Sequence, residues 1–199
     1  MRAILALEDG SVFIGSHFGT TGTEVGEACF NTSMTGYQEI LTDPSYAGQG
    51  VVMSYPLIGN YGVNHEDNES RRPWVEALVV RHLSPQGSNF RCEDTLDSYL
   101  KQYAITGIQG VDTRALTKIL RSQGSMNGML TCAEHFNVAE VMERLRSYEV
   151  KDTIRRVTRT EPEVFDAYGE ETHLVAVMDY GVKQNIIEYL RRRGCKVVA

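Results

Sequence analysis

Residues 30–60 read FNTSMTGYQEILTDPSYAGQGVVMSYPLIGN. Small hydroxyl and amide side chains lie here between two apolar segments. Within the stretch, Asp43-Pro44-Ser45-Tyr46 predicts a turn, because proline presets the backbone angle of the second turn position and aspartate accepts hydrogen bonds from nearby main-chain groups. Such a turn fixes the direction of the Ser45 hydroxyl. The residues alone therefore predict a rigid polar loop between a short helix and a strand, which is a suitable place for binding.

Outward from this loop, the sequence predicts a strand-rich domain. Apolar segments flank Asp9-Gly10, a dipeptide favoured in tight hairpins, so we expect the chain to open with a β-hairpin. Further strands are predicted where apolar and β-branched side chains alternate or run together. These segments are residues 25–32, 50–55, 74–82, 108–111 and 128–132.

The glycines that follow the hairpin do not form a phosphate-binding loop. They stand at positions 15, 19, 22 and 26, which fit neither G-x-G-x-x-G nor a P-loop, and no Gly-Lys-Ser/Thr follows them. We expect turns and a bulge at the start of a strand instead.

Helices are predicted where apolar side chains recur every three to four residues after a polar cap. Besides about one turn at residues 37–41, this pattern marks residues 95–103, the segment from Asp112 to about residue 123, and a helix that begins after Asn137. The start Asp112-Thr113-Arg114 could bind a ligand, but helix capping explains it equally well and is preferred.

Two polar segments lie between the predicted elements. Residues 64–72 are expected to form a surface loop, with His65 and Glu66 solvated because no second pair of metal ligands is nearby. Residues 151–172 are expected to link two domains, and their three arginines, at positions 155, 156 and 159, either pair with a partner or form a solvated basic face.

After this linker the pattern changes to that of a parallel sheet. Residues 174–178 form a continuous apolar run, followed by the turn Asp179-Tyr180-Gly181, a helix over residues 183–193 and a second apolar run. This βαβ order is typical of an α/β fold. We expect residues 1–150 to form one domain and residues 173–199 to be the start of a second.

Composition excludes several functional classes. The chain has 199 residues and a net charge of −6, which disfavours a nucleic-acid surface. No apolar run is long enough to cross a bilayer, and the acidic residue Glu8 comes too early for a signal peptide. The four cysteines, at positions 29, 92, 132 and 195, form no C-x-x-C pair, so we expect free thiols, no metal site and a cytoplasmic protein.

Four separated motifs make the chain resemble one family, the small, glutamine-hydrolysing subunit of carbamoyl phosphate synthetase. They are FNTSMTGYQEILTDPSY at residues 30–46, YPLIGN at 55–60, DTRALT at 112–117 and DYGVKQNI at 179–186. The resemblance covers essentially the whole chain. It implies a layered β/β/α N-terminal domain of the swivelling type, followed by the first βαβ elements of a class I amidotransferase domain with a flavodoxin-like fold.

The resemblance also implies a mechanism. A cysteine thiolate attacks the glutamine side-chain amide, forms a thioester and releases ammonia, which a large partner subunit combines with bicarbonate using ATP and magnesium, in arginine and pyrimidine synthesis. The family's catalytic cysteine, histidine and glutamate are expected beyond Ala199, so this chain holds no catalytic residue or cofactor. The serine of the family's D-P-S-Y motif, which contacts glutamine, corresponds to Ser45.

Two alternatives remain at this stage. Ser45 either contacts glutamine, as the motif favours, or only closes its own turn. The N-terminal part either helps to complete a glutamine pocket or serves only as a docking module for the large subunit. Nucleotide binding by the βαβ segment is disfavoured, because Asp179-Tyr180-Gly181 lacks the glycine spacing that lets backbone approach phosphate.

Overall fold

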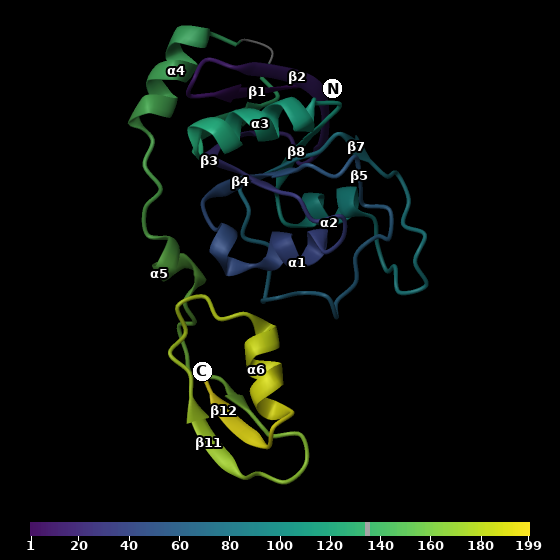
Figure 1. The fold of residues 1–199 in the computed structure, drawn as a ribbon, viewed down its shortest axis with the longest axis vertical. Coiled ribbons are helices and arrows are strands. Elements are labelled where there is room, and N and C mark those ends of the chain that lie inside the picture. Colours follow the sequence, from purple (N-terminus) through teal and green to yellow (C-terminus); the bar gives the residue numbers. More distant parts are fainter. Residues whose placement is uncertain (134–135) are drawn as a thin grey trace.

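The computed structural model describes residues 1–133 and 136–199 and has a mixed α/β architecture (Figure 1). A strand-rich part contains the strands β1 Arg2–Leu7, β2 Val12–Gly19, β3 Thr23–Asn31, β4 Gln49–Met53, β5 Leu57–Ile58, β6 Ala77–Val79, β7 His82–Leu83, β8 Thr106–Gln109 and β9 Met126–Thr131. Its helices are α1 Tyr37–Thr42, the 3₁₀ turn Pro44–Tyr46, α2 Leu96–Gln102, α3 Thr113–Gln123 and α4 Val138–Ser147. The remaining elements are α5 Thr153–Val157, β10 Val164–Phe165, β11 His173–Ala176, α6 Gln184–Arg191 and β12 Cys195–Val198.

Seven strands of the first part pair into a closed barrel in the order β1-β2-β8-β6-β4-β3-β9. The predicted hairpin is confirmed, since β1 and β2 pair antiparallel with Ala6 opposite Val12. β9 pairs with both β1 and β3 and so joins the two ends of the seven-stranded sheet. Closure leaves no free edge among these seven strands.

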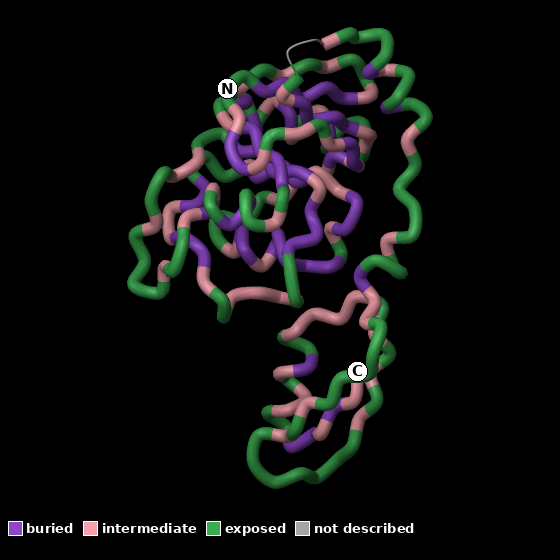
Figure 2. Tube along the Cα trace, turned by 180° about the vertical axis from the view of Figure 1, so that it is seen from behind, coloured by how far each residue is buried: buried purple, intermediate pink, exposed green. Residues whose placement is uncertain are grey.

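The barrel is held by apolar side chains that alternate between its two faces, as the two-residue period of a strand requires. In β4, Val52 packs with side chains from the other barrel strands, so it faces the interior, where α3 adds Leu116. Its neighbour Val51 packs on the outer face against α1 and α2. Figure 2 shows that the buried residues, in purple, are concentrated in the barrel part of the molecule.

The predicted helix caps are confirmed. Asp112 accepts a hydrogen bond from the Ala115 N–H at 3.1 Å, and Asn137 accepts one from the Ala139 N–H at 3.0 Å. The strand expected over residues 74–82 is shorter than predicted, since only residues 77–79 pair with the barrel strands, and His82 already belongs to β7. Capping is therefore a sufficient structural role for Asp112.

The expectation of turns at the early glycines is wrong for Gly15 and Gly19, whereas Gly26 falls within the strand expected over residues 25–32. Gly15 and Gly19 lie in β2, and Gly26 lies in β3. A Cβ atom at Gly15 would stand 2.2 Å from the Gln109 carbonyl oxygen on β8, and one at Gly26 would stand 2.9 Å from the Gly48 oxygen. These two glycines are needed for close approach of backbones inside paired strands rather than for turns.

Two carboxylates lie beside a small cavity of about 20 Å³ within the barrel. Glu24 and Glu76 line it together with glycines and apolar side chains. Burial raises the pKa of Glu24, and the nearby negative charge of Glu76 raises it further, while Arg144 partly opposes both effects. Glu76 is itself paired with Arg156 at 2.8 Å.

We expect Glu24→Gln to stabilise the protein at pH 7 and to change its stability little near pH 4. A raised folded-state pKa means that the contribution of Glu24 to folding is present below the unfolded-state pKa and is lost as pH rises through the folded-state pKa. The glutamine side chain at position 24 avoids this loss of stability, because it carries no charge at any of these pH values. Urea unfolding of both proteins at several pH values tests this, and a constant difference between them would contradict it.

The segment expected to be a linker contains more structure than predicted. It holds α5 and also β10, which pairs antiparallel with β12, so the C-terminal sheet has the order β10-β12-β11. The predicted βαβ unit is confirmed, because β11 and β12 are parallel and α6 connects them. The division into domains at 150 and 173 stays a prediction. In the described part of the chain, no helix combines the length and apolar character that crossing a membrane requires.

Two of the three arginines of this segment are paired with acidic side chains, while Arg155 is exposed. Arg156 pairs with Glu76, and Arg159 approaches Asp179 at 3.0 Å and also contacts Glu163. Arg156 and Arg159 therefore hold residues 151–172 against the barrel part and against the turn at Asp179.

Candidate functional site

The helix before the Asp43-Pro44 turn begins without a side-chain cap of its own. Gly36, at its start, has φ 84°, a conformation that favours glycine. The Tyr61 hydroxyl replaces the cap by accepting hydrogen bonds from the N–H groups of Gly36 at 2.6 Å and Tyr37 at 3.2 Å. The two tyrosine rings stack with 4.2 Å between their centroids. This contact fixes the direction in which α1 carries the chain to the turn.

Two polar side chains of α1 hold the loop of residues 64–72. Gln38, 1% exposed, accepts a hydrogen bond from the Asn64 N–H at 3.0 Å and donates one to the Asn68 side chain at 2.7 Å. Thr42 accepts a bond from the Glu69 N–H at 2.8 Å. The hydroxyl and amide residues of the 30–60 stretch therefore tie a second loop to the turn.

Asp43 connects the turn to the C-terminal part of the chain. One of its carboxylate oxygens accepts a hydrogen bond from the Ser45 N–H at 2.9 Å. The other oxygen lies 2.6 Å from the Lys183 ammonium, just before α6, and this contact raises the pKa of Lys183. The motifs at residues 30–46 and 179–186, far apart in sequence, are thus in direct contact.

The 64–72 loop makes a second connection to α6. The Glu69 carbonyl accepts a hydrogen bond from the Gln184 N–H at 2.6 Å, and its carboxylate accepts one from the Asn185 amide at 2.6 Å. In the turn that precedes α6, the Asp179 carboxylate accepts hydrogen bonds from the N–H groups of Gly181 and Val182, both at 2.8 Å. Fixed polar groups therefore surround the junction.

A cleft of about 370 Å³ lies at this junction. Pro44, Asn68, Ser70, Arg159, Asp179 and Gln184 contribute to its lining. This set offers amide, hydroxyl, carboxylate and guanidinium groups, which suit a small polar ligand that carries both an amide and charged groups.

Ser45 is exposed and lies on the turn whose Pro44 lines the cleft, but it is not itself part of that lining. Among the described residues its hydroxyl has no hydrogen-bond partner. Asp43 holds its backbone in place. The Ser45 side chain can therefore donate to or accept from a ligand without breaking an existing contact.

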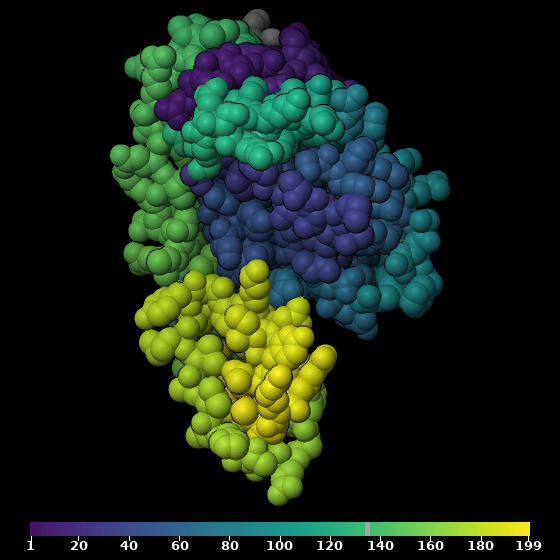
Figure 3. Space-filling model, in the orientation of Figure 1, coloured from purple at the N-terminus to yellow at the C-terminus, as the bar shows by residue number. Residues whose placement is uncertain are grey.

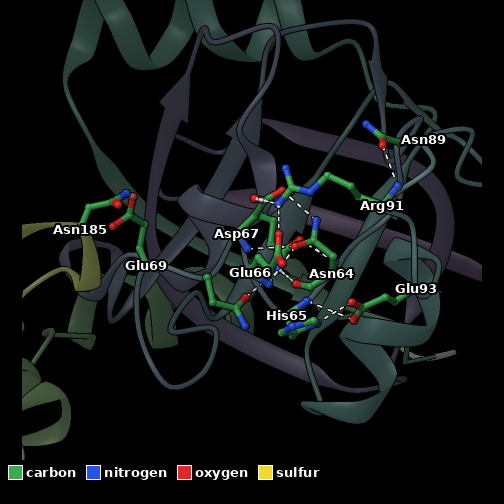
Figure 4. Close-up of polar contacts among 11 residues, drawn as sticks. Asn64, His65, Glu66, Asp67, Glu69, Asn89, Arg91, Glu93 and Asn185 are labelled. Atoms are coloured by element: carbon green, nitrogen blue, oxygen red, sulfur yellow. Dashed lines mark hydrogen bonds and ion pairs between the residues drawn. The ribbon is translucent and has the colours of Figure 1, made fainter. Parts of the chain in front are cut away.

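His65 and Glu66, expected to be solvated, are exposed, and both also make polar contacts at the surface (Figure 4). His65 contacts Glu93, and Arg91 donates to Glu66 at 3.0 Å and to Asp67 at 2.6 Å. No group of His, Cys, Asp and Glu suited to a metal ion occurs among the residues described.

Arg91→Ala is expected to raise the pKa of Asp67. Burial of Asp67 acts to raise its pKa, but hydrogen bonds from Asn64 and Arg91 outweigh burial and lower it. Because the pKa of Asp67 is lower in the folded state, its carboxylate stabilises the fold at pH values above the unfolded-state pKa of about 4. This contribution is lost as the pH falls through the folded-state pKa. Removing Arg91 should reduce that acid sensitivity. An NMR titration of the Asp67 carboxyl measures the shift, with Arg121→Ala as control. An unchanged pKa would contradict the assignment.

The cysteines do not supply a nucleophile to the cleft. All four are unpaired, and none lines it. Cys195 is buried and the other three are half-buried. Burial, helped by the charge of Glu27, raises the pKa of Cys29 to about 12, so its reactive thiolate form is scarce at neutral pH.

Sequence reasoning placed Ser45 on the turn but missed its neighbours. Lys183 and Glu69, which join the turn and loop to α6, were not singled out as site residues. Lys183 lies within the quoted motif at residues 179–186, so the motif contained the signal. Glu69 stands in a charged loop where no spacing distinguishes it from Glu66.

The comparisons with known proteins give a consistent result. The sequence profile described as "Carbamoyl-phosphate synthase small chain, CPSase domain" matches residues 5–130. The chain is 51% identical to the carbamoyl phosphate synthase small chain of Akkermansia muciniphila, with 99% of this chain and 55% of that protein covered. It is 48% identical to the small chain of Clostridium perfringens, with 99% and 55% covered.

A third relative is the carbamoyl phosphate synthase pyrimidine-specific small chain of Halalkalibacterium halodurans. It is 44% identical over 99% of this chain and 54% of that protein. The chain therefore spans about half the length of the curated relatives it matches.

Proposed function

Because this chain belongs to the carbamoyl phosphate synthase small chain family, we propose that it is the N-terminal part of a glutamine-hydrolysing synthetase subunit. In this proposal the complete subunit releases ammonia from glutamine. A larger partner subunit, which uses ATP and magnesium, then combines the ammonia with bicarbonate to form carbamoyl phosphate. The swivelling-type and flavodoxin-like amidotransferase folds are the finer assignments that accompany this function.

The observation that carries the proposal is the contact between the turn at Asp43 and the start of α6 at Lys183. This contact supports the proposal because it holds the turn that carries Ser45 against the βαβ unit, near a cleft lined by amide, hydroxyl and charged groups. We propose that the Ser45 hydroxyl forms a hydrogen bond with bound glutamine, while Asp43 keeps the turn rigid. Rigid support of this kind limits the entropy lost on binding.

The reaction divides between this chain and residues outside it. A thiolate attacks the carbon of the glutamine side-chain amide, the C–N bond breaks with proton transfer to the leaving nitrogen, and water hydrolyses the thioester to glutamate. We propose that the cysteine, histidine and glutamate of this step lie outside residues 1–199, which agrees with the raised pKa of the half-buried Cys29 thiol. The unpaired cysteines also suit a cytoplasmic protein.

The test compares the full-length protein with residues 1–199. The full-length protein, mixed with the larger subunit, is expected to support carbamoyl phosphate synthesis with glutamine as nitrogen donor, whereas residues 1–199 alone should not hydrolyse glutamine. Glutaminase activity of residues 1–199 would contradict the placement of the nucleophile. Failure of the full-length protein to use glutamine would overturn the proposed function.

A further inference from the structure

Two of the four quoted motifs take no part in the cleft at Lys183. The motifs at residues 55–60 and 112–117 meet instead at a second cleft of about 670 Å³, formed by Ser54, Pro56, Arg81 and α3 with its cap Asp112. We call this surface the α3 face. Figure 3 shows α3 as an exposed band across the front of the barrel part.

The α3 face is positively charged although the chain as a whole carries −6. Arg114, Lys118 and Arg121 all line the cleft and are exposed. Their spacing of four and three residues places them on one side of the helix. Arg81 has a partner, Asp112, at 3.7 Å, but no ion pair among the described residues involves the other three cations.

The arrangement of these cations favours an extended acidic partner over a single phosphate. Residues 114 and 121 are separated by seven helical steps of 1.5 Å, so the row of charge is about 10 Å long. Carboxylates on a facing helix or extended segment repeat over the same distance. No aromatic side chain lines the cleft to stack a nucleotide base.

Exposed large side chains in the motif at residues 55–60, which contributes Pro56 to the cleft, suit a protein partner as well. Tyr55 is 36% exposed and Leu57 is 41% exposed, although both are large apolar residues.

We propose that the α3 face docks an acidic segment of a protein partner. On the proposed function, that partner is the larger synthetase subunit, so the inference rests on that function and names the surface it uses. The cations steer the acidic segment and fix its register.

The experiment uses the full-length small subunit and the larger subunit. Lys118→Glu with Arg121→Glu reverses two charges on the α3 face, and Arg144→Glu with Arg146→Glu reverses two exposed charges on α4. The α3 variant is expected to weaken binding by about tenfold or more and to reduce its salt dependence, whereas the α4 variant should bind as the wild type does. Surface plasmon resonance at two salt concentrations measures the affinity and its salt dependence, and circular dichroism verifies that each variant is folded. Lys118→Ala with Arg121→Ala, which adds no acidic charge, should weaken binding in the same direction.

Three other results would overturn or change this proposal. Wild-type binding by both α3 variants, or equal weakening by the α3 and α4 charge reversals, overturns the docking surface while leaving the proposed function intact if glutamine-dependent synthesis persists. Binding of ATP or inorganic phosphate to the isolated wild-type subunit, lost in the α3 variant, would replace the acidic partner with a phosphate ligand. Absence of both binding and glutamine-dependent synthesis in the wild type would overturn the proposed function and this inference together.

Discussion

On the proposed function, Ser45→Ala in the full-length subunit is expected to raise the glutamine KM about tenfold, the effect of losing roughly 1.4 kcal/mol of hydrogen-bond energy to the substrate. Synthesis with ammonia as nitrogen donor should remain nearly unchanged, because ammonia bypasses the glutamine pocket. Steady-state kinetics with each nitrogen donor measure the two effects. The difference between donors separates a binding role of Ser45 from a structural one.

The chain offers a matched control for this substitution. Ser33 is also exposed, and its N–H donates to the Asn31 side chain at 2.8 Å, just as the Ser45 N–H donates to Asp43 at 2.9 Å. Ser33→Ala should leave the glutamine KM at its wild-type value. Equal loss of glutamine-dependent and ammonia-dependent synthesis in Ser45→Ala would point to a folding or docking defect and would contradict the proposed contact.

Gly15→Ala is expected to lower the free energy of unfolding by at least about 2 kcal/mol. The added Cβ would stand 2.2 Å from the Gln109 carbonyl oxygen, so the backbones of β2 and β8 would have to separate. This pairing is one of the links that close the barrel. Urea unfolding followed by circular dichroism measures the change.

Gly50→Ala is the matched control on β4. The nearest atom to a Cβ at Gly50 is the Ala77 Cβ at 3.7 Å, which is ordinary van der Waals contact. Gly50 also lines the small barrel cavity, so the methyl group has space. We expect Gly50→Ala to be neutral or to stabilise by about 0.4–1 kcal/mol, because alanine restricts the unfolded chain. Similar losses in both variants would show that steric contact is not the cause.

Local features of the fold could be predicted because their causes lie within a few residues. Asp9-Gly10 predicts the β1–β2 hairpin, Asp112 and Asn137 predict helix starts, and the apolar runs after residue 173 predict the parallel β11–β12 pair. In each case a cap, a turn or a hydrophobic period determines the local structure without help from distant parts of the chain.

Features that depend on distant partners could not be predicted in this way. Gly15 is required by a carbonyl on β8, and nothing near Gly15 in sequence indicates that neighbour. Barrel closure depends on β9 pairing with two strands at once. At the candidate site, the turn at Ser45 followed from its own residues, whereas the Asp43–Lys183 contact joins segments that only the tertiary fold brings together.

Closure of the barrel by β9 has a consequence for synthesis of the protein on the ribosome. One edge of β1 and one edge of β3 find their partner only in residues 126–131. At about 5–20 residues per second, β1 therefore waits roughly 6–25 s after its own translation before its second neighbour exists. During that interval unpaired strand edges are exposed to other nascent chains, and contacts this remote in sequence form slowly. The same pairing that protects the finished barrel leaves strand edges exposed while the protein is being made.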